Sequence, residues 1–324
     1  VWKLTGGLHV SDATNASRTA LVDIRAGRWD DDLLELFRVP SSALPEIVDC
    51  AGEFSSTDPR LLGAAVPIRG MAGDQQSAAI GQACLASGDT KATYGTGAFV
   101  LTHTGADAPL SRHRLLTTIA WQLCGERAFA LEGSVFVAGS LVQWLRDALG
   151  LIADSAETAA LAGSVPDSGG VYVVPAHCGL GAPHWRPDAR GAISGLSFAT
   201  GKAQIVRAAL EAMAHQTHDL MAAFASDGAA WEVLKIDGGM AANDWVAQDL
   251  ADLLDLPVER PHFVETTALG AAMLAAVGGG LHATLDAAAA MRGAVDRFEP
   301  ALEPATRESR LEGWRGALRA AIGA

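Results

Sequence analysis

Cysteine and aromatic residues are scarce in this chain of 324 residues, and neither is arranged for a familiar role. The 4 cysteines, which form no Cys-x-x-Cys pair, are Cys50, Cys84, Cys124 and Cys178. This spacing argues against a zinc site or a disulfide scaffold and is typical of the reducing cytosol. The sequence shows neither an apolar run of membrane-spanning length nor a basic and apolar leader. We therefore expect a cytoplasmic protein without membrane insertion.

Basic residues are also few relative to acidic ones. Lys and Arg total 24 against 37 Asp and Glu, which leaves a formal net charge of -13 at pH 7. Such a chain repels nucleic acid and anionic lipid at long range, so we expect neither as a partner. The remaining composition, 49% hydrophobic and 19% charged, is typical of a soluble globular protein, and the length allows two domains.

A Gly-x-Gly-x-x-Gly turn of the Rossmann type is absent as well, although strand and helix patterns are plentiful. The expected helices cover residues 75–87, 136–149, 203–224 and 244–254. The expected strands cover residues 66–68, 90–93, 99–102, 115–122, 127–131, 171–175, 233–236 and 257–259. Strand pairs followed by alternating strands and helices favour an α/β domain with a mixed sheet.

The first motif of chemical interest is the glycine-lined turn at residues 70–76. It presents the carboxylate of Asp74 next to the amides of Gln75 and Gln76, at the start of an expected helix. A lone Asp beside glycines is most often a turn or helix-capping residue. The glycines keep Asp74 approachable, however, and a helix N-terminus lowers the proton affinity of a carboxylate. A weak resting base suits phosphoryl transfer, in which the hydroxyl proton becomes acidic only as the bond to phosphorus forms.

A second glycine-rich turn lies at residues 93–99, where Gly95 and Gly97 flank the hydroxyl of Thr96. Without a Cβ in the way, its backbone N–H groups can approach phosphate oxygens. The same pattern also suits a tight hairpin turn, and Gly-x-Gly alone is a weak signal. A base beside a phosphate-binding turn is nevertheless the minimum equipment for moving a phosphoryl group onto an alcohol.

Two further segments suit a nucleotide. The Asp-Gly-Gly junction at residues 237–239 lies between an expected strand and an expected helix, with Asn243 four residues on. Good turn chemistry alone is the alternative explanation for this junction. Gly139 and Gln143 lie one turn apart on the helix expected at residues 136–149. A glycine inside a helix costs about 1 kcal/mol relative to Ala, which a nucleotide base or, more commonly, a neighbouring helix would explain.

The order of these motifs resembles the FGGY family of carbohydrate kinases over essentially the whole chain. The stretches that carry the resemblance are residues 12–19 (DATNASRT), 29–30 (WD), 70–76 (GMAGDQQ), 93–99 (TYGTGAF), 131–136 (LEGSVF), 143–147 (QWLRD), 179–185 (GLGAPHW), 189–193 (ARGAI), 237–239 (DGG) and 267–272 (TALGAA). The run at residues 179–185 favours members that act on glycerol over kinases of xylulose and other sugars. Departures from the family pattern at residues 121–123 and 177–178 fall on no expected site residue.

The resemblance implies an α/β fold of actin-like ATPase (ribonuclease-H-like) domains, with the active site in the cleft between two of them. Residues 1–78 would be the C-terminal remnant of the first domain, and residues 79–324 would be the second domain, on the nucleotide-binding side. The reaction would transfer the γ-phosphoryl group of ATP, accompanied by Mg²⁺, to a terminal hydroxyl of glycerol. The product would be sn-glycerol 3-phosphate.

The resemblance also implies roles for particular residues. Asp74 would be the general base toward the substrate hydroxyl, and Gln75 and Phe99 would line the glycerol pocket with it. The expected ATP contacts are Thr96, Gly139, Gln143, Gly239 and Asn243. A separate metal-ligating cluster is not expected.

Two alternatives stay open at this point. Family members begin with a phosphate-binding Asp-x-Gly-Thr-type turn, and most of their glycerol contacts lie in that first domain. Nothing of this kind precedes Val1 here, so we expect a piece of a longer enzyme whose activity in isolation is in question. A kinase of another polyol or ketose is one alternative, and a non-catalytic nucleotide-binding module is the other. The oligomeric state is open, and a homo-oligomer is compatible with the sequence.

Overall fold

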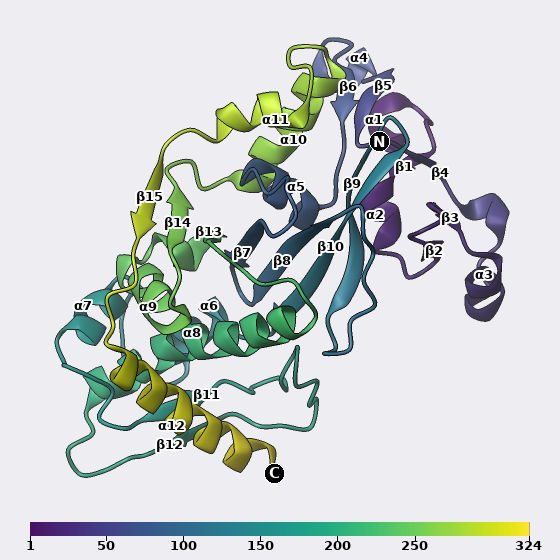
Figure 1. Cartoon of the computed structure of the whole chain (residues 1–324). Helices are drawn as coiled ribbons and strands as arrows, with labels where there is room; N and C mark the ends of the chain where they lie inside the picture. The colour runs from purple at the N-terminus through teal and green to yellow at the C-terminus, as the bar shows by residue number, and fades with distance from the viewer. Residues whose placement is uncertain (324) are drawn as a thin grey trace.

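The computed structural model describes residues 1–323, and at its centre lies a seven-stranded mixed sheet (Figure 1). Its strands follow the order β15-β14-β13-β7-β8-β10-β9. They are β7 (Thr90–Tyr94), β8 (Ala98–Gly105), β9 (Leu116–Leu123), β10 (Glu126–Val135), β13 (Leu234–Asp237), β14 (Val258–Pro261) and β15 (Val295–Phe298). Strands β7, β13 and β14 run parallel, and the other neighbours pair antiparallel. The mixed α/β architecture is therefore confirmed.

One face of this sheet packs on the long helix α8 (Lys202–Ser226) and forms the main core. Alternate strand residues such as Ala92 and Val100 point to it and are fully buried. Tyr94 lies on the same face, and its hydroxyl is 2.8 Å from the hydroxyl of Thr217 on α8. The single long helix thus anchors the middle of the sheet from one side.

The opposite face packs on two helices in backbone contact, α5 (Asp74–Gly81) and α10 (Thr266–Gly278). A Cβ on Gly81 would lie 2.0 Å from a carbonyl oxygen of α10. A Cβ on Gly270 would lie 1.8 Å from a carbonyl oxygen of α5. Both glycines are therefore required by the closeness of the two helices rather than by a turn.

Helix α5 is shorter than the helix expected at residues 75–87, and that expectation is wrong beyond Gly81. The next residue, Gln82, turns its side chain into the protein, where Nε2 donates to the carbonyl of Ile236 at 3.0 Å. Ala83 then adopts a left-handed φ of 52°. The inward hydrogen bond ends a helix that the alanine-rich sequence would otherwise continue.

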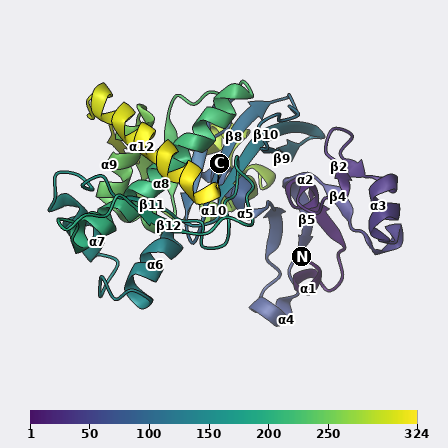
Figure 2. The ribbon, with the colours of Figure 1, turned by 90° about the horizontal axis from the view of Figure 1, so that it is seen from below.

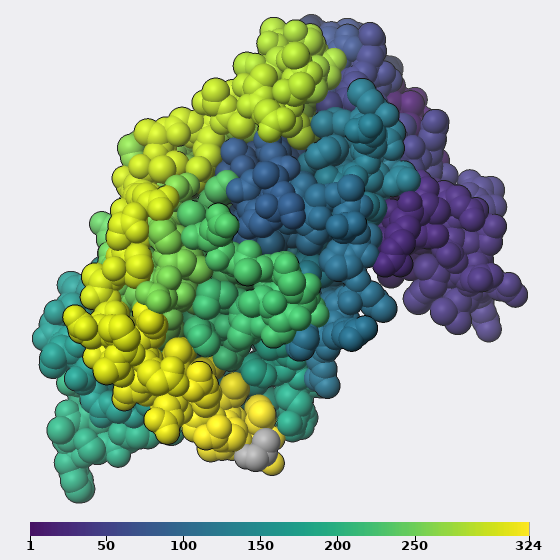
Figure 3. Space-filling view, viewed as in Figure 1, coloured from purple at the N-terminus to yellow at the C-terminus, as the bar shows by residue number. Residues whose placement is uncertain are grey.

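Residues 1–73 form an N-terminal segment of short elements beside the main sheet (Figures 1 and 2). Its elements are α1 (Trp2–Thr5), β1 (Val10–Asp12), α2 (Ala13–Ser17), β2 (Val22–Asp23), β3 (Arg28–Trp29), α3 (Asp31–Phe37), η1 (Ser41–Ala43), β4 (Glu46–Val48), β5 (Ala51–Ser56), α4 (Pro59–Leu62) and β6 (Pro67–Gly70). The strands pair as β1-β4, β2-β3 and β5-β6. Part of this segment projects from the molecule (Figure 3), and Trp2, Leu36 and Phe37 are exposed on it.

Polar contacts join the N-terminal segment to the main sheet. Arg18, next to α2, forms an ion pair of 2.7 Å with the buried carboxylate of Glu132 on β10. The hydroxyls of Ser17 and Thr118 on β9 lie 3.0 Å apart. The C-terminal part of α10 packs on β6, so the same helix touches both parts of the chain.

The remaining elements are α6 (Gly139–Asp147), α7 (Glu157–Gly163), β11 (Tyr172–Val174), β12 (Ala192–Ser194), η2 (Gly239–Ala242), α9 (Asp244–Leu254), α11 (Leu285–Ala288), η3 (Ala289–Arg292) and α12 (Pro304–Ile322). Of these, α11 and η3 pack beside α10, and the others lie on the α8 side of the sheet or at the ends of its strands. Helix α12 docks through Arg310, which pairs with Asp249 at 2.8 Å, and burial raises the pKa of Asp249 to about 6. Among residues 1–323, no helix is both long enough and apolar enough to span a membrane.

Replacing Gly270 by Ala is expected to lower the free energy of unfolding by about 1–3 kcal/mol, because overpacking would push α5 and α10 apart. Urea denaturation measures the change. The control is Gly316→Ala on α12, since no heavy atom lies within 4 Å of the added Cβ. Helix propensity alone should make the control neutral or stabilising by up to about 1 kcal/mol. Equal losses in the two variants would contradict the close contact.

Candidate functional site

The register of the sheet brings several sequence motifs into one row. Asp237 at the end of β13 pairs with Thr93 on β7. Thr93 pairs in turn with Phe99 on β8, and Phe99 pairs with Ser134 on β10. Paired residues point to the same side of a sheet, and here it is the side covered by α5 and α10. The turns that follow these strands therefore open beside the first residues of both helices.

Asp74 is the first residue of α5, and its carboxylate is exposed. Its Oδ1 accepts a hydrogen bond of 2.7 Å from the N–H of Gln75. The preceding Gly73 donates its N–H to Thr14 Oγ1 at 2.7 Å, and Thr14 is hydrogen-bonded to the buried Asp12. The N-terminal segment thus fixes the turn that precedes Asp74, while the Asp74 carboxylate itself faces solvent.

Gln75 and Phe99, the other two residues expected at the polyol, lie on neighbouring parts of this face. Gln75 is half-buried, and its Oε1 accepts a hydrogen bond from the ammonium of Lys91 on β7. Phe99 keeps 39% of its surface exposed, as a side chain that lines an open site would. Sequence reasoning does not single out Lys91, although a lysine inside a strand expected at the centre of a sheet is a signal that could have found it.

A cavity of about 260 Å³ opens beside the turn at residues 95–97. Its lining is made of Tyr94, Gly95, Thr96, Gly139, Val142, Gln143, Arg146, Ser155, Gly239 and Met240. Four of the five residues expected to contact ATP are in this lining, and they come from three separate segments of the chain. The structure therefore brings Thr96, Gly139, Gln143 and Gly239 together around one space.

The wall of this cavity is held by two glycines that lie directly against the backbone of another segment. A Cβ on Gly139 would lie 2.6 Å from the carbonyl oxygen of Gly95, and the N–H of Gly139 donates to that oxygen at 2.9 Å. Gly238 has a φ of 88°, and a Cβ there would lie 2.6 Å from the carbonyl oxygen of Tyr94. The first turn of α6 and the 237–239 junction thus both rest on the backbone of the 93–99 turn.

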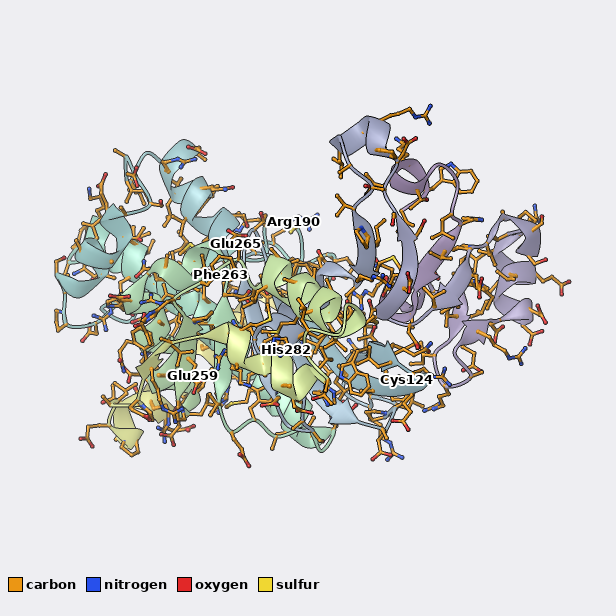
Figure 4. The ribbon with its side chains drawn as sticks, turned by 90° about the horizontal axis from the view of Figure 1, so that it is seen from above. Cys124, Arg190, Glu259, Phe263, Glu265 and His282 are labelled. Carbon is orange, nitrogen blue, oxygen red and sulfur yellow. The ribbon has the colours of Figure 1, made fainter. Side chains whose placement is uncertain are left out.

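Asp237 is buried in a chain of hydrogen bonds rather than open to the cavity. Its Oδ2 accepts from Thr266 Oγ1 at 2.7 Å and from Gln82 Nε2 at 3.0 Å. Gln82 Oε1 accepts from Arg292, which pairs with Glu259 at 2.9 Å (Glu259 is labelled in Figure 4). The Asp237 carboxylate therefore fastens the first residue of α10 to the end of β13.

Asn243 lies outside the cavity lining. Its Oδ1 caps α9 by accepting from the N–H groups of Trp245 at 3.0 Å and Val246 at 3.3 Å. Its Nδ2 donates to Thr158 Oγ1 at 3.2 Å. This side chain already has structural partners on α7 and α9, and its contact with a nucleotide stays a prediction.

The run at residues 179–185 packs against the end of β10, next to the site. Its Ala182 donates an N–H to the carbonyl of Ser134 at 3.0 Å, at the end of β10. A Cβ on Gly181 would lie 2.3 Å from the same oxygen. The run therefore braces the strand end next to Phe99 and lies outside the lining of the cavity at Thr96.

Comparison with known proteins defines the class of this fold and site. Residues 90–279 match the FGGY family of carbohydrate kinases, C-terminal domain, and residues 1–81 match the N-terminal domain of that family. The chain therefore belongs to the FGGY family of carbohydrate kinases, and the resemblance noted in the sequence is confirmed. With this family comes the actin-like ATPase fold that the resemblance implied.

The similar proteins are named as glycerol kinases. The chain is 54% identical over 320 residues to glycerol kinase of Rhodospirillum centenum, covering 98% of this chain and 64% of that protein. It is 55% identical over 323 residues to glycerol kinase of Allorhizobium ampelinum, covering 98% and 65%. The chain thus spans slightly less than two thirds of the length of these relatives.

Solved structures agree on the fold. A crystal structure of Plasmodium falciparum glycerol kinase with ADP has a TM-score of 0.92 and 36% identity, covering 99% of this chain and 65% of that one. A ligand-bound xylulose kinase from Lactobacillus acidophilus has a TM-score of 0.86 at 22% identity, covering 100% and 66%. At that identity the second comparison shows the fold alone.

Replacing Thr266 by Val should lower the free energy of unfolding by about 1–3 kcal/mol, because the buried Asp237 carboxylate loses its hydroxyl donor at similar side-chain volume. Urea denaturation measures the loss. Thr267→Val, at the next position on α10, is the control because Thr267 is exposed. A Thr266 variant as stable as the Thr267 variant would show that Asp237 does not depend on this hydrogen bond.

Proposed function

We propose that the chain is the part of a glycerol kinase that carries the catalytic base and the nucleotide site. The whole enzyme would transfer the γ-phosphoryl group of ATP to glycerol, giving sn-glycerol 3-phosphate. One observation carries the proposal: Thr96, Gly139, Gln143 and Gly239, all expected to contact ATP, meet around a single cavity. The names of the relatives at 54–55% identity support the choice of glycerol as the acceptor.

The domain division and the compartment are part of the same proposal. Residues 1–78 would complete the first FGGY domain and residues 79–324 would form the second, as the family matches at residues 1–81 and 90–279 support. We place the enzyme in the cytoplasm because its cysteines are all free. Its proposed ligands are glycerol and ATP.

The chemistry follows from the exposed acid at the start of α5. Asp74 would take the proton of the terminal hydroxyl while the hydroxyl oxygen bonds to the γ-phosphorus. The bond from that phosphorus to the β,γ-bridging oxygen breaks, and ADP leaves. Gln75 and Phe99 would hold the polyol, the first by a hydrogen bond and the second against its carbon atoms. Backbone N–H groups of the Thr96 turn would face the phosphates.

Magnesium would enter with the nucleotide. Among residues 1–323, no three His, Cys, Asp or Glu side chains are grouped as metal ligands. Mg²⁺ in kinase sites is held mainly by phosphate oxygens and water, with one or two protein carboxylates. Asp237 is already hydrogen-bonded and Asp74 is assigned to the substrate hydroxyl, so phosphate oxygens and water would hold the ion. The ion would neutralise charge on the phosphates.

The proposal is tested by glycerol-dependent release of ADP from Mg-ATP. Two proteins are compared: this chain, and a chimera that joins it to the part of Rhodospirillum centenum glycerol kinase that it does not cover. We expect turnover from the chimera, and its loss by at least roughly a thousandfold in Asp74→Asn because the proton acceptor is gone. Affinity for ADP should stay nearly unchanged, as measured by calorimetry.

Each other outcome has a definite meaning. Turnover of another polyol or a ketose in preference to glycerol would replace the substrate but keep the kinase. ADP binding without turnover of any acceptor by the chimera would favour a non-catalytic nucleotide-binding module. An Asp74→Asn variant with full turnover would remove Asp74 from its role as base.

Filling the cavity should weaken nucleotide binding without harming the fold. Gly239 lines the cavity, and no heavy atom lies within 4 Å of an added Cβ. In Gly239→Leu we therefore expect at least a roughly tenfold weaker affinity for ADP, at an unchanged thermal midpoint. Gly163→Leu on α7, whose Cβ position is equally open, is the matched control and should bind ADP normally. Equal ADP affinity in the two variants would place the nucleotide elsewhere.

A further inference from the structure

Lys91 is an unusual residue for the middle of a sheet, since it is fully buried and has no acidic partner. Its Nζ donates to Gln75 Oε1 and, at 2.9 Å, to Thr93 Oγ1. Among residues 1–323, no carboxylate oxygen lies within 4.0 Å of Lys91 Nζ, the distance that defines an ion pair. Burial lowers the pKa of Lys91, and the more distant carboxylates of Asp237, Glu132 and Asp74 oppose that shift.

Stability alone does not account for this lysine. A buried ammonium loses its hydration and here recovers only hydrogen bonds to neutral groups, so a hydrocarbon of the same length would fold at least as well. Its cross-strand neighbours are the apolar Leu101 and another cation, Lys235, so neither compensates its charge. Helix α5 is already held to α10 by the glycine contacts. The role of Lys91 must therefore lie in how it orients its hydrogen-bond partners, Gln75 and Thr93.

Lys91 determines which end of the Gln75 side-chain amide faces it. An ammonium can only donate hydrogen bonds, so its partner in the Gln75 amide must be the oxygen and not the nitrogen. The amide nitrogen must then point away from Lys91. No group among residues 1–323 accepts a hydrogen bond from Gln75 Nε2, and Gln75 stands next to the exposed Asp74.

We propose that Lys91 is a positioning residue that turns the Gln75 amide so that Nε2 donates to a hydroxyl oxygen of the polyol. Asp74 beside it accepts from the hydroxyl that becomes phosphorylated. A donor and an acceptor side by side suit a substrate with hydroxyls on adjacent carbons. This inference rests on the proposed function and deepens it, because it names how the acceptor substrate is recognised.

The test is a double-mutant cycle in the chimera, with kinetics for glycerol and for ATP. Lys91→Met removes the charge at similar length, and we expect the KM for glycerol to rise roughly tenfold, the cost of one misdirected hydrogen bond. The KM for ATP should stay unchanged, and the thermal midpoint should not fall. In a Gln75→Ala background, Lys91→Met should change the KM for glycerol no further, because Lys91 acts through Gln75.

The control is Lys235→Met on the neighbouring strand. Lys235 pairs with Lys91 in the sheet register, but its Nζ forms an ion pair with Asp89 at 3.0 Å instead of touching Gln75. We expect this variant to lose thermal stability, because Asp89 is left unpaired, and to keep the KM for glycerol. Lys91→Met should therefore change the KM for glycerol and not the thermal stability, and Lys235→Met should do the reverse.

The outcomes separate this inference from the function on which it rests. A chimera without glycerol-dependent turnover overturns the proposed function before any Lys91 variant is compared. In an active chimera, a Lys91→Met effect that persists in full in the Gln75→Ala background overturns the positioning role alone. A parallel rise in the KM values for glycerol and ATP with a lower thermal midpoint would also overturn it, since it would show a merely structural lysine.

Discussion

Backbone contact between α5 and α10 sets the geometry of the whole site. Asp74 begins α5, and Thr266 begins α10 and holds Asp237 at the end of β13. Gly81 and Gly270 let the helices approach until carbonyl oxygens occupy the space where side chains would be. Because neither helix can shift without separating from the other, the acid and the strand ends keep a fixed relation.

The cavity proposed for the nucleotide depends on the same kind of contact, in which glycines let two backbone segments approach closely. Gly139 and Gly238 rest on the backbone of the 93–99 turn, and the cavity lies where these segments meet. The proposed polyol site depends instead on a buried charge, since the hydrogen bond from Lys91 fixes which end of the Gln75 amide faces it. In the proposed function, close backbone packing would shape the space for the nucleotide, and a directional hydrogen bond would orient a side chain toward the polyol.

Several features follow from local pattern, and others do not. The glycines around Asp74 and Thr96 predicted open turns at strand ends, and the structure has them there. The helix pattern predicts that Gly139 contacts a nucleotide base or a neighbouring helix, and the nearest group to an added Cβ is the carbonyl oxygen of Gly95. The helix expected at residues 75–87 ends early because Gln82 finds a partner more than 150 residues away in sequence, at Ile236.

The sequence by itself determined most strands of the main sheet (though not β15), the glycine turns, the family, and the place of Asp74 at a helix start. These properties depend on residues within one turn or one strand of each other. Only the tertiary structure decided that Lys91 meets Gln75 and that Asn243 bonds to Thr158. Such contacts depend on sheet register and helix packing, which join distant segments and leave no periodic signal in the chain.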